Sequence, residues 1–313
     1  MSPRHLVVLG TASQVPTRYR NHNAYLLRFD DEGILFDPGE GAQRQLIHAG
    51  VRSTAITKIC ITHFHGDHCL GLAGVSQLLS LDGCPHAVDV FYPASGEEYY
   101  QRLRRASIYN DNATVRAHPI AAAGVLWSGP SQRGRTVLSS LPLDHGVPAW
   151  GYRFEEEAGW TLQPSRLAAA GLSGPDIGEL QRQGRTRVGD REILLAEVAF
   201  PRPGQAVAFV MDTRMCDNAI TLARGADLLV CEATYLEEDR DKAEAHGHLT
   251  AREAGIIARE AGVRRLVLTH FSRRYERGAP FLTQAEAEFT EGEIFAARDF
   301  DVIELPELHR ELA

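Results

Sequence analysis

The chain has 313 residues, of which 44% are hydrophobic and 24% charged, with a formal net charge of −8 at pH 7. This length is sufficient to bury a core, and the composition is that of an ordinary globular protein. The acidic balance does not favour a nucleic-acid-binding protein, whose domains usually carry a basic excess, but clustered arginines leave that class open. No apolar run approaches the roughly 20 residues of a membrane helix, so we expect no membrane contact.

The cysteines and the first residues bear on the cellular location. The cysteines are odd in number and show no Cys-x-x-Cys spacing: Cys60, Cys69, Cys84, Cys216 and Cys231. Such a set argues against a disulfide scaffold and against a cysteine-based zinc site. The opening MSPRHLVVLGTAS has a short apolar run typical of a strand, without the length or cleavage site of a signal peptide. We therefore expect a cytoplasmic location.

The first half of the chain alternates between strand and helix patterns. Strands are expected at residues 6–11, 24–29, 34–39, 58–62 and 87–93. Helices are expected at residues 40–50, 70–81 and 95–109. The first of these helices ends on a glycine, as helices commonly do. Strand character returns over residues 135–156.

The pattern changes between residues 159 and 203, which are rich in glycine, arginine and turn-forming residues. We expect this segment to be an insertion that protrudes from the domain. Strands then resume at residues 206–213, 227–234, 264–270 and 302–305, with helices between them, the longest at 249–262. Strands accompanied by helices in both halves predict a single α/β domain over residues 1–313, with sheets in the middle and helices outside.

The segment ITHFHGDHCLGL, residues 61–72, is dense in side chains that bind metals. Its candidates are His63, His65, Asp67 and His68. A single histidine beside a core is usually a packed, hydrogen-bonded residue, but four such side chains this close together are hard to explain by packing. They follow a predicted strand directly, so they lie in a turn from which they can point to a common site.

Three further candidates each follow an apolar strand: His145, Asp212 and His270. Strand ends on one edge of a sheet converge in space, where α/β sheets place their sites. Imidazole and carboxylate without thiolate suit zinc, with manganese or iron as alternatives. The number of ligands is right for two ions that share a carboxylate, and such a pair can activate a water for displacement at phosphorus.

Spacing divides the candidates into two sets. The first set, expected to share one ion, is His63, His65 and His145. The second set is Asp67, His68 and His270. Asp212 can place one oxygen on each ion, and Asp67 is also our candidate for orienting the water and taking its proton. The remaining histidines with no ligand-like context are expected to be structural or exposed: His5, His22, His48, His86, His118 and His309.

The pattern His-x-His-x-Asp-His after a strand, with later His, Asp and His at strand ends, resembles the signature of the metallo-β-lactamase fold. The resemblance covers nearly the whole chain. It implies a four-layer αββα sandwich with a dinuclear zinc site. It does not determine the substrate, because this fold carries hydrolases of lactams, thioesters, lactones and phosphodiesters.

Four local motifs resemble those of the ribonuclease Z family, whose members remove 3′ trailers from precursor tRNA. VPTRYRN at 15–21 is similar to that family's Pro-x-Lys-x-Arg-Asn loop, and CEAT at 231–234 is similar to its His-Glu-Ala-Thr motif. GPDIGELQRQG at 174–184 is similar to a motif in the flexible arm that binds the tRNA elbow. HGHLTA supplies His248, which matches the family's histidine beside the leaving group.

The chain departs from these family motifs at three positions. Arg18 stands where lysine is usual, which keeps the charge but replaces a point donor with a planar fork. Cys231 replaces the first histidine of the His-Glu-Ala-Thr motif, so Glu232 is expected to have other support. Met211 precedes Asp212 where the family more often has glycine. None of these departures removes a predicted metal ligand.

The resemblance implies roles for residues outside the metal ligands. His248, held by Glu232, would protonate the departing ribose 3′-oxygen. The candidates for contact with RNA are Arg18, Arg20, Asn21, Gly174, Pro175, Arg182, Arg185 and Arg187. For His248 and for the loop residues, a simple role in a helix entry or a turn is nearly as good an explanation from the residues alone.

The resulting hypothesis is a zinc-dependent endoribonuclease that removes the 3′ trailer of precursor tRNA, with two zinc ions per subunit or manganese in their place. It would leave a 3′-hydroxyl on the tRNA and a 5′-phosphate on the trailer. The resemblance also implies a homodimer in which the arm over residues 159–203 binds tRNA. One alternative is a dizinc hydrolase of small lactones, thioesters or phosphodiesters with the same fold. Another is a non-catalytic RNA-binding protein with a decayed site, which the complete ligand set argues against.

Overall fold

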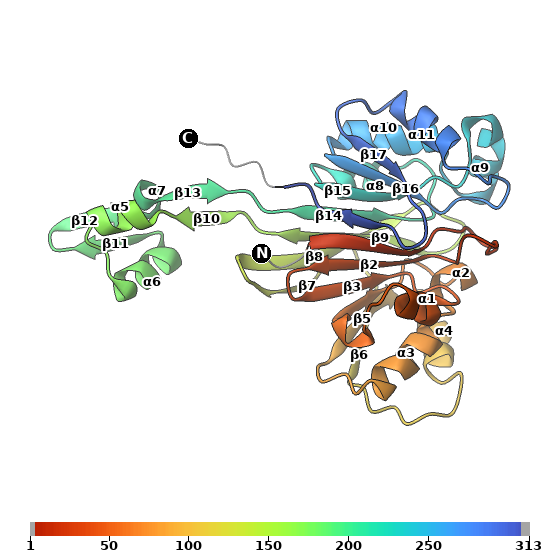
Figure 1. The fold of residues 1–313 in the computed structure, drawn as a ribbon, viewed down its shortest axis with the longest axis horizontal. Helices are drawn as coiled ribbons and strands as arrows, with labels where there is room; N and C mark the ends of the chain where they lie inside the picture. Colours follow the sequence, from red (N-terminus) through yellow and green to blue (C-terminus); the bar gives the residue numbers. More distant parts are fainter. Residues whose placement is uncertain (1–3, 308–313) are drawn as a thin grey trace.

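The structure, a computed structural model, describes residues 4–307. Two seven-stranded sheets pack face to face, and helices cover the outer face of each sheet (Figure 1). The four-layer αββα arrangement expected from the sequence is therefore confirmed. His309 and the ends of the predicted 1–313 domain lie outside the described residues.

The first sheet comes from the N-terminal half, apart from one strand at its edge. In spatial order its strands are β18 (Val302–Glu304), β1 (Arg4–Gly10), β2 (Ala24–Phe29), β3 (Glu32–Phe36), β4 (Lys58–Cys60), β5 (Val88–Pro93) and β6 (Val115–Ile120). The helices on its outer face are α1 (Ala42–His48), α3 (Leu72–Leu81) and α4 (Glu97–Arg104). A short helix, α2 (Gly66–Cys69), carries part of the histidine cluster.

The second sheet comes from residues 124–296, the middle and C-terminal parts of the chain. In spatial order its strands are β17 (Glu293–Ala296), β16 (Arg265–Thr269), β15 (Leu228–Glu232), β14 (Ala206–Val210), β9 (Ala149–Glu156), β8 (Gly134–Leu143) and β7 (Gly124–Ser131). Its helices are α8 (Asp217–Ala223), α9 (Arg240–His246), α10 (Ala251–Ala261) and α11 (Ala279–Glu286). Strands β8, β14, β15 and β16 run in one direction, so their carboxyl ends share one edge.

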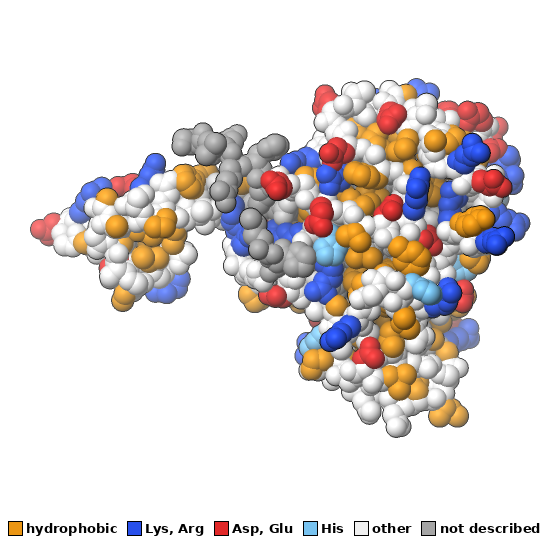
Figure 2. Space-filling model, in the orientation of Figure 1, with side chains coloured by type: hydrophobic (Ala, Val, Ile, Leu, Met, Phe, Trp, Pro, Cys, Tyr) orange, Lys and Arg blue, Asp and Glu red, His pale blue; other side chains and the backbone are white. Residues whose placement is uncertain are grey.

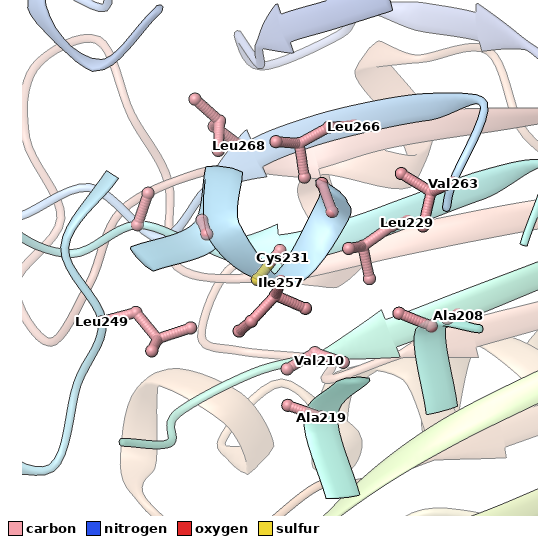
Figure 3. Packing of buried hydrophobic residues seen from close by; sticks show 14 of the residues in the cluster. Ala208, Val210, Ala219, Leu229, Cys231, Leu249, Ile257, Val263, Leu266 and Leu268 are labelled. Atoms are coloured by element: carbon pink, nitrogen blue, oxygen red, sulfur yellow. The ribbon is translucent and has the colours of Figure 1, made fainter. Parts of the chain in front are cut away.

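Apolar faces of the elements hold the layers together. Between the sheets, the rings of Phe36 and Phe209 stack with centroids 4.5 Å apart. Outside the second sheet, Ile257 of α10 packs on the strands beside Leu229 and Cys231 (Figure 3). Burying an aliphatic side chain of this size contributes about 1.5–3 kcal/mol. The sheets thus form a rigid frame for the loops at their edge.

Residues 159–202 form an arm that projects from the body (Figure 1). The arm comprises β10 (Gly159–Leu162), α5 (Pro164–Ala169), α6 (Gly174–Gln183), β11 (Arg185–Val188), β12 (Arg191–Leu194), α7 (Leu195–Val198) and β13 (Ala199–Arg202). Strands β10 and β13 pair as its stalk, and β11 pairs with β12. Its tip has a small apolar core of its own around Leu180 and Ile193.

In the two main sheets, three strands escaped the sequence patterns, namely β6, β7 and β17. All three lie at sheet edges, where half-exposed or polar residues replace the alternation that marks a covered strand. The strand expected at 34–39 stops at Phe36, because Asp37 turns into the left-handed region with φ of 45°. Over residues 4–307, no helix is long and apolar enough to cross a membrane.

Candidate dinuclear metal centre

The seven predicted ligands converge where the carboxyl ends of strands from both sheets meet. Four of them follow β4, and the others directly follow β8, β14 and β16. They form two groups, and within each group the possible ligand atoms all lie within 4.8 Å of one another. The first group is His63, His65, His145 and Asp212, and the second is Asp67, His68 and His270. The division follows the spacing argument made from the sequence.

Asp212 stands between the two groups. Its Oδ2 lies 3.6 Å from Nε2 of His63 and 3.7 Å from Nε2 of His145. Its Oδ1 lies 3.4 Å from Nε2 of His68 and 3.3 Å from Nε2 of His270. One carboxylate therefore presents a different oxygen to each group, as a bridging ligand of two cations does.

Unpaired buried atoms and the local electrostatics of the site both suit bound cations. Oδ1 of Asp212 and Nε2 of His270 are buried and have no hydrogen-bond partner among the described residues. Buried polar atoms are rarely left unpaired, so their shared orientation calls for a ligand between them. Burial alone lowers the pKa of His68, but Asp212, Asp67 and Asp37 outweigh it and raise that pKa well above its usual range. The position favours positive charge, which a cation supplies.

The far nitrogen of four histidines is bonded within the protein. His68 Nδ1 lies 2.8 Å from Oδ2 of Asp37, and His270 Nδ1 lies 2.7 Å from Oγ1 of Thr234. His63 and His145 approach Thr62 Oγ1 at 3.0 Å and the carbonyl of residue 247 at 2.9 Å. Such contacts orient the ring and aim its other nitrogen at the metal.

Sequence reasoning missed these supporting residues. Asp37 had a usable signal, since it directly follows the apolar run Ile34–Phe36, as Asp212 directly follows the apolar run that ends at Met211. Asp37, Asp212 and His270 all have positive φ, at 45°, 35° and 61°. Non-glycine residues with positive φ are strained, and such residues cluster at functional sites, where the surrounding structure holds the backbone in place. Thr62 and Thr234 carried no such mark, because hydroxyl residues at strand ends are common.

His248 lies beside the metal ligands and pairs with Glu232. Its Nδ1 is 3.1 Å from Oε1 of Glu232 and 3.9 Å from Oδ2 of Asp212. Burial lowers the pKa of His248, but these two carboxylates outweigh it and raise the pKa to about 9. A protonated imidazole in this position can act as a general acid.

Glu232 is fully buried. Other residues hold it by hydrogen bonds, as expected from the replacement of the motif histidine by Cys231. The backbone N–H of Thr213 donates to its Oε1 at 2.8 Å, and Thr234 Oγ1 donates to its Oε2 at 2.5 Å. Cys231 points the other way, into the apolar layer under α10 (Figure 3). Strand alternation therefore separates the two side chains, and the cysteine takes no part in the site.

The site opens to solvent on the side of the first group. His65 is exposed and the side chain of His248 is 13% exposed, whereas the side chain of His145 is 3% exposed and those of His63, His68 and His270 are fully buried. A substrate can therefore reach the ligand groups from the side where His248 lies.

The chain is similar in sequence to known proteins over almost its whole length. The Beta-lactamase superfamily domain matches residues 33–271. Ribonuclease Z of Nocardia farcinica is 54% identical over 306 residues, covering 98% of this chain and 99% of that protein. Ribonuclease Z of Streptomyces avermitilis is 51% identical over 309 residues, covering 99% and 100%. The chain belongs to the ribonuclease Z family.

Solved structures agree with this assignment. The short form of human tRNase Z superposes with a TM-score of 0.69 at 25% identity, covering 97% of this chain and 100% of that one. The metallo-β-lactamase fold protein YhfI of Bacillus subtilis superposes with a TM-score of 0.70 at 19% identity, covering 97% and 100%, which supports the fold alone. As a member of the ribonuclease Z family, the protein is an endoribonuclease that cleaves phosphodiester bonds.

The loop that resembles a ribonuclease Z motif lies next to the second ligand group, because Gln14 N–H donates to Oδ2 of Asp67 at 2.6 Å. Arg18 is exposed on this loop. Arg20 donates to the carbonyls of Tyr275 at 2.7 Å and of residue 276 at 3.3 Å. Asn21 donates to the carbonyl of residue 40 at 2.8 Å. Arg20 and Asn21 thus hold the loop in place, and the exposed guanidinium of Arg18 lies over the ring of Tyr19, 5.8 Å from its centroid.

The arm candidates of the ribonuclease Z motif lie far from the ligand groups in the chain's fold (Figure 1). Gly174 and Pro175 begin α6, whose first turn is closed by a capping box between Ser173 and Asp176. Three arginines follow on the exposed surface of the arm: Arg182, Arg185 and Arg187. Of these, Arg185 lies 3.5 Å from Glu192. Their contact with RNA stays a prediction.

Proposed function

We propose that this ribonuclease removes the 3′ trailer of precursor tRNA, leaving a 3′-hydroxyl on the tRNA and a 5′-phosphate on the trailer. The observation that carries the proposal is the position of Asp212 between two groups of histidines, with His248 alongside. Relatives named ribonuclease Z that match over almost the full length, and the human tRNase Z of the same fold, support tRNA as the substrate.

Two divalent cations fit the site, and zinc suits its ligands best, with manganese as an alternative. The first would be held by His63, His65 and His145, and the second by Asp67, His68 and His270. Asp212 would contact both. When bound, such a pair acidifies a water and stabilises charge on the phosphate oxygens during an in-line displacement.

The protein's own residues would handle the protons. Asp67 would orient the attacking water and take its proton, since its carboxylate lies at the edge of the second group, 3.4 Å from His68 Nε2. His248 would give its proton to the ribose 3′-oxygen as the P–O3′ bond breaks. Glu232 would hold the imidazole in place at 3.1 Å and stabilise its charged form. General acid catalysis of this kind typically contributes about 10²–10⁴-fold in rate.

The arm and the loop of residues 15–21 would bind the RNA at two separated places. The arm would meet the folded part of the tRNA through Gly174, Pro175, Arg182, Arg185 and Arg187, and Arg18 would meet the acceptor end. We further propose a homodimer in which the arm of one subunit presents RNA to the other, acting in the cytoplasm. Sedimentation of the active enzyme as a monomer would contradict the dimer.

The proposal is tested with a 5′-labelled precursor tRNA carrying a 3′ trailer, incubated with and without a chelator. A metal-dependent cut after the discriminator nucleotide, with a 3′-hydroxyl on the labelled product, is the expected result. Metal-loaded protein that hydrolyses bis-p-nitrophenyl phosphate but leaves this RNA intact would favour the small-molecule hydrolase instead.

A further inference from the structure

Three buried charged side chains, Arg4, Asp30 and Glu156, meet the 14% exposed side chain of Arg202 where the arm joins the body. The guanidinium of Arg4 pairs with Asp30 at 2.5 Å and with Glu156 at 3.0 Å. Arg202 pairs with the other oxygen of Glu156 at 2.9 Å. The side chain of Glu156 is 0% exposed, and those of Arg4 and Asp30 are 7% and 5% exposed. The charges balance, and none of these residues belongs to the metal site or to the proposed RNA contacts.

These residues come from both sheets and from the stalk. Arg4 begins β1 of the first sheet, and Glu156 ends β9 of the second. Arg202 is the last residue of β13, which is one strand of the stalk. Arg202 also donates to the carbonyl of Arg133, in the turn between β7 and β8. The network therefore connects the stalk to three separate parts of the body.

The backbone at the same place is tightly packed. Glu156 N–H donates to the carbonyl of Gln205 at 2.8 Å, and the Gln205 side chain accepts from Arg4 Nη1 at 2.8 Å. A Cβ added to Gly204 would meet the carbonyl oxygen of Glu156 at 1.7 Å. The two chain segments that enter the arm thus lie against each other with no room for a side chain. The base of the stalk is therefore closely packed against the body.

We propose that the network of Arg4, Asp30, Glu156 and Arg202 is the anchor that sets the direction of the arm relative to the metal site. Buried ion pairs are weak evidence for stability, but their directional geometry can specify one arrangement over others. An apolar contact at this place would tolerate rotation, whereas the two-nitrogen grip of Arg4 on Glu156 and the bonds of Arg202 to Glu156 and to the carbonyl of Arg133 restrict it. Because the arm is long and, within residues 4–307, projects from the body on its stalk, a small rotation at the base moves its tip by a larger distance (Figures 1 and 2).

The consequence for RNA cleavage rests on the proposed function. If the arm of one subunit and the metal site of the other bind one tRNA, the direction of the arm on its own body determines the effective concentration of the scissile bond at that site. A loosened arm lowers that concentration without changing the chemistry. These four are positioning residues, and their loss is expected to raise KM for precursor tRNA far more than it lowers kcat.

The first test measures the arm's direction without RNA. Spin labels are placed on the arm at Glu192→Cys and on the body at Glu286→Cys, with Cys84 and Cys216 replaced by serine. Glu156→Gln keeps the shape of the side chain and removes the charge shared by both arginines. We expect a broader or shifted distance distribution. The matched control is Glu288→Gln, which removes a carboxylate paired with Arg252 and Arg259 on the outer helical layer.

An unchanged distribution in Glu156→Gln would overturn the inference, whatever the protein does with RNA. Arg202→Lys keeps the charge, and it provides a milder variant should the first fail to fold. It is expected to shift the distribution in the same direction by less.

The second test measures kinetics in the same variants. We expect KM for precursor tRNA to rise about tenfold in Glu156→Gln, with hydrolysis of bis-p-nitrophenyl phosphate unchanged. A parallel loss of both activities would indicate general destabilisation and would overturn the positioning role. Wild-type protein that does not cleave precursor tRNA would instead defeat the proposed function, and the distance measurement would still decide the anchor.

Discussion

Nδ1 of His68 lies 2.8 Å from Oδ2 of Asp37, and both side chains are fully buried. Asp37 also accepts the backbone N–H and the hydroxyl of Thr62, each at 2.7 Å. Burial raises the pKa of Asp37, while its contacts with His68 and Thr62 oppose that rise. This aspartate therefore holds a predicted ligand of the second ion in place without facing the metal itself.

Asp37→Asn is predicted to weaken metal binding. The amide has the same shape but cannot offer a charged acceptor to both His68 and Thr62, so about 10–100-fold in affinity should be lost. Titration of the apo protein with zinc, followed by a competing chelator dye, measures this. Asp89→Asn is the matched control, because Asp89 Oδ1 lies 2.8 Å from His118 Nε2 away from the site. Equal zinc affinity in both variants would contradict the role.

Asp212→Ala is predicted to disturb both ions at once. Its two oxygens face separate groups, at 3.7 Å from His145 and 3.3 Å from His270. Removing it takes a ligand from each, whereas His145→Ala takes a ligand from the first group alone. Metal analysis after gel filtration should show a larger loss in Asp212→Ala than in His145→Ala. If Asp212→Ala loses no more metal than His145→Ala, Asp212 does not bridge.

His248→Ala is predicted to keep its metals and to lose cleavage of precursor tRNA by about 10²–10⁴-fold. The reason is that both predicted ligand groups keep all their members without His248, which contacts Glu232 at 3.1 Å, although its ring also lies in a third cluster of possible ligands with Asp212 and His270. Metal content and single-turnover cleavage are measured side by side. His246→Ala serves as the control, since His246 is an exposed neighbour on α9. Wild-type cleavage by His248→Ala would remove the proposed acid.

Replacement of residues 160–200 by a two-residue turn is predicted to separate the two activities. Gly159 pairs with Arg202 across the stalk, so the cut ends are adjacent and a short hairpin can close them. Arg202 and its buried partners are retained. We expect cleavage of precursor tRNA to fall at least about 100-fold, while hydrolysis of bis-p-nitrophenyl phosphate persists. Intact tRNA cleavage would show that the arm is dispensable.

Much of the fold was predictable because most strands are covered on both faces. The run at β14 is continuously apolar, and β2 and β16 each contain a run of buried leucine or valine residues, which is the pattern that burial between sheet and helix imposes. The edge strands β6 and β7 were not predictable in this way, since one side of each faces solvent. Their place is set by backbone pairing, of β6 with β5 and of β7 with β8.

The sequence by itself picked out seven side chains as predicted metal ligands, because they have the right chemistry and follow strands whose ends must meet. It also predicted an insertion between residues 159 and 203, where the structure has the arm of residues 159–202. Only the tertiary structure decided that Asp212 presents one oxygen to each group and that Asp37 stands behind His68. It likewise decided that Arg4 and Arg202, far apart in the chain, share Glu156 beneath the arm. Contacts of this kind depend on which strands become neighbours in the fold, and local sequence patterns do not predict which strands these are.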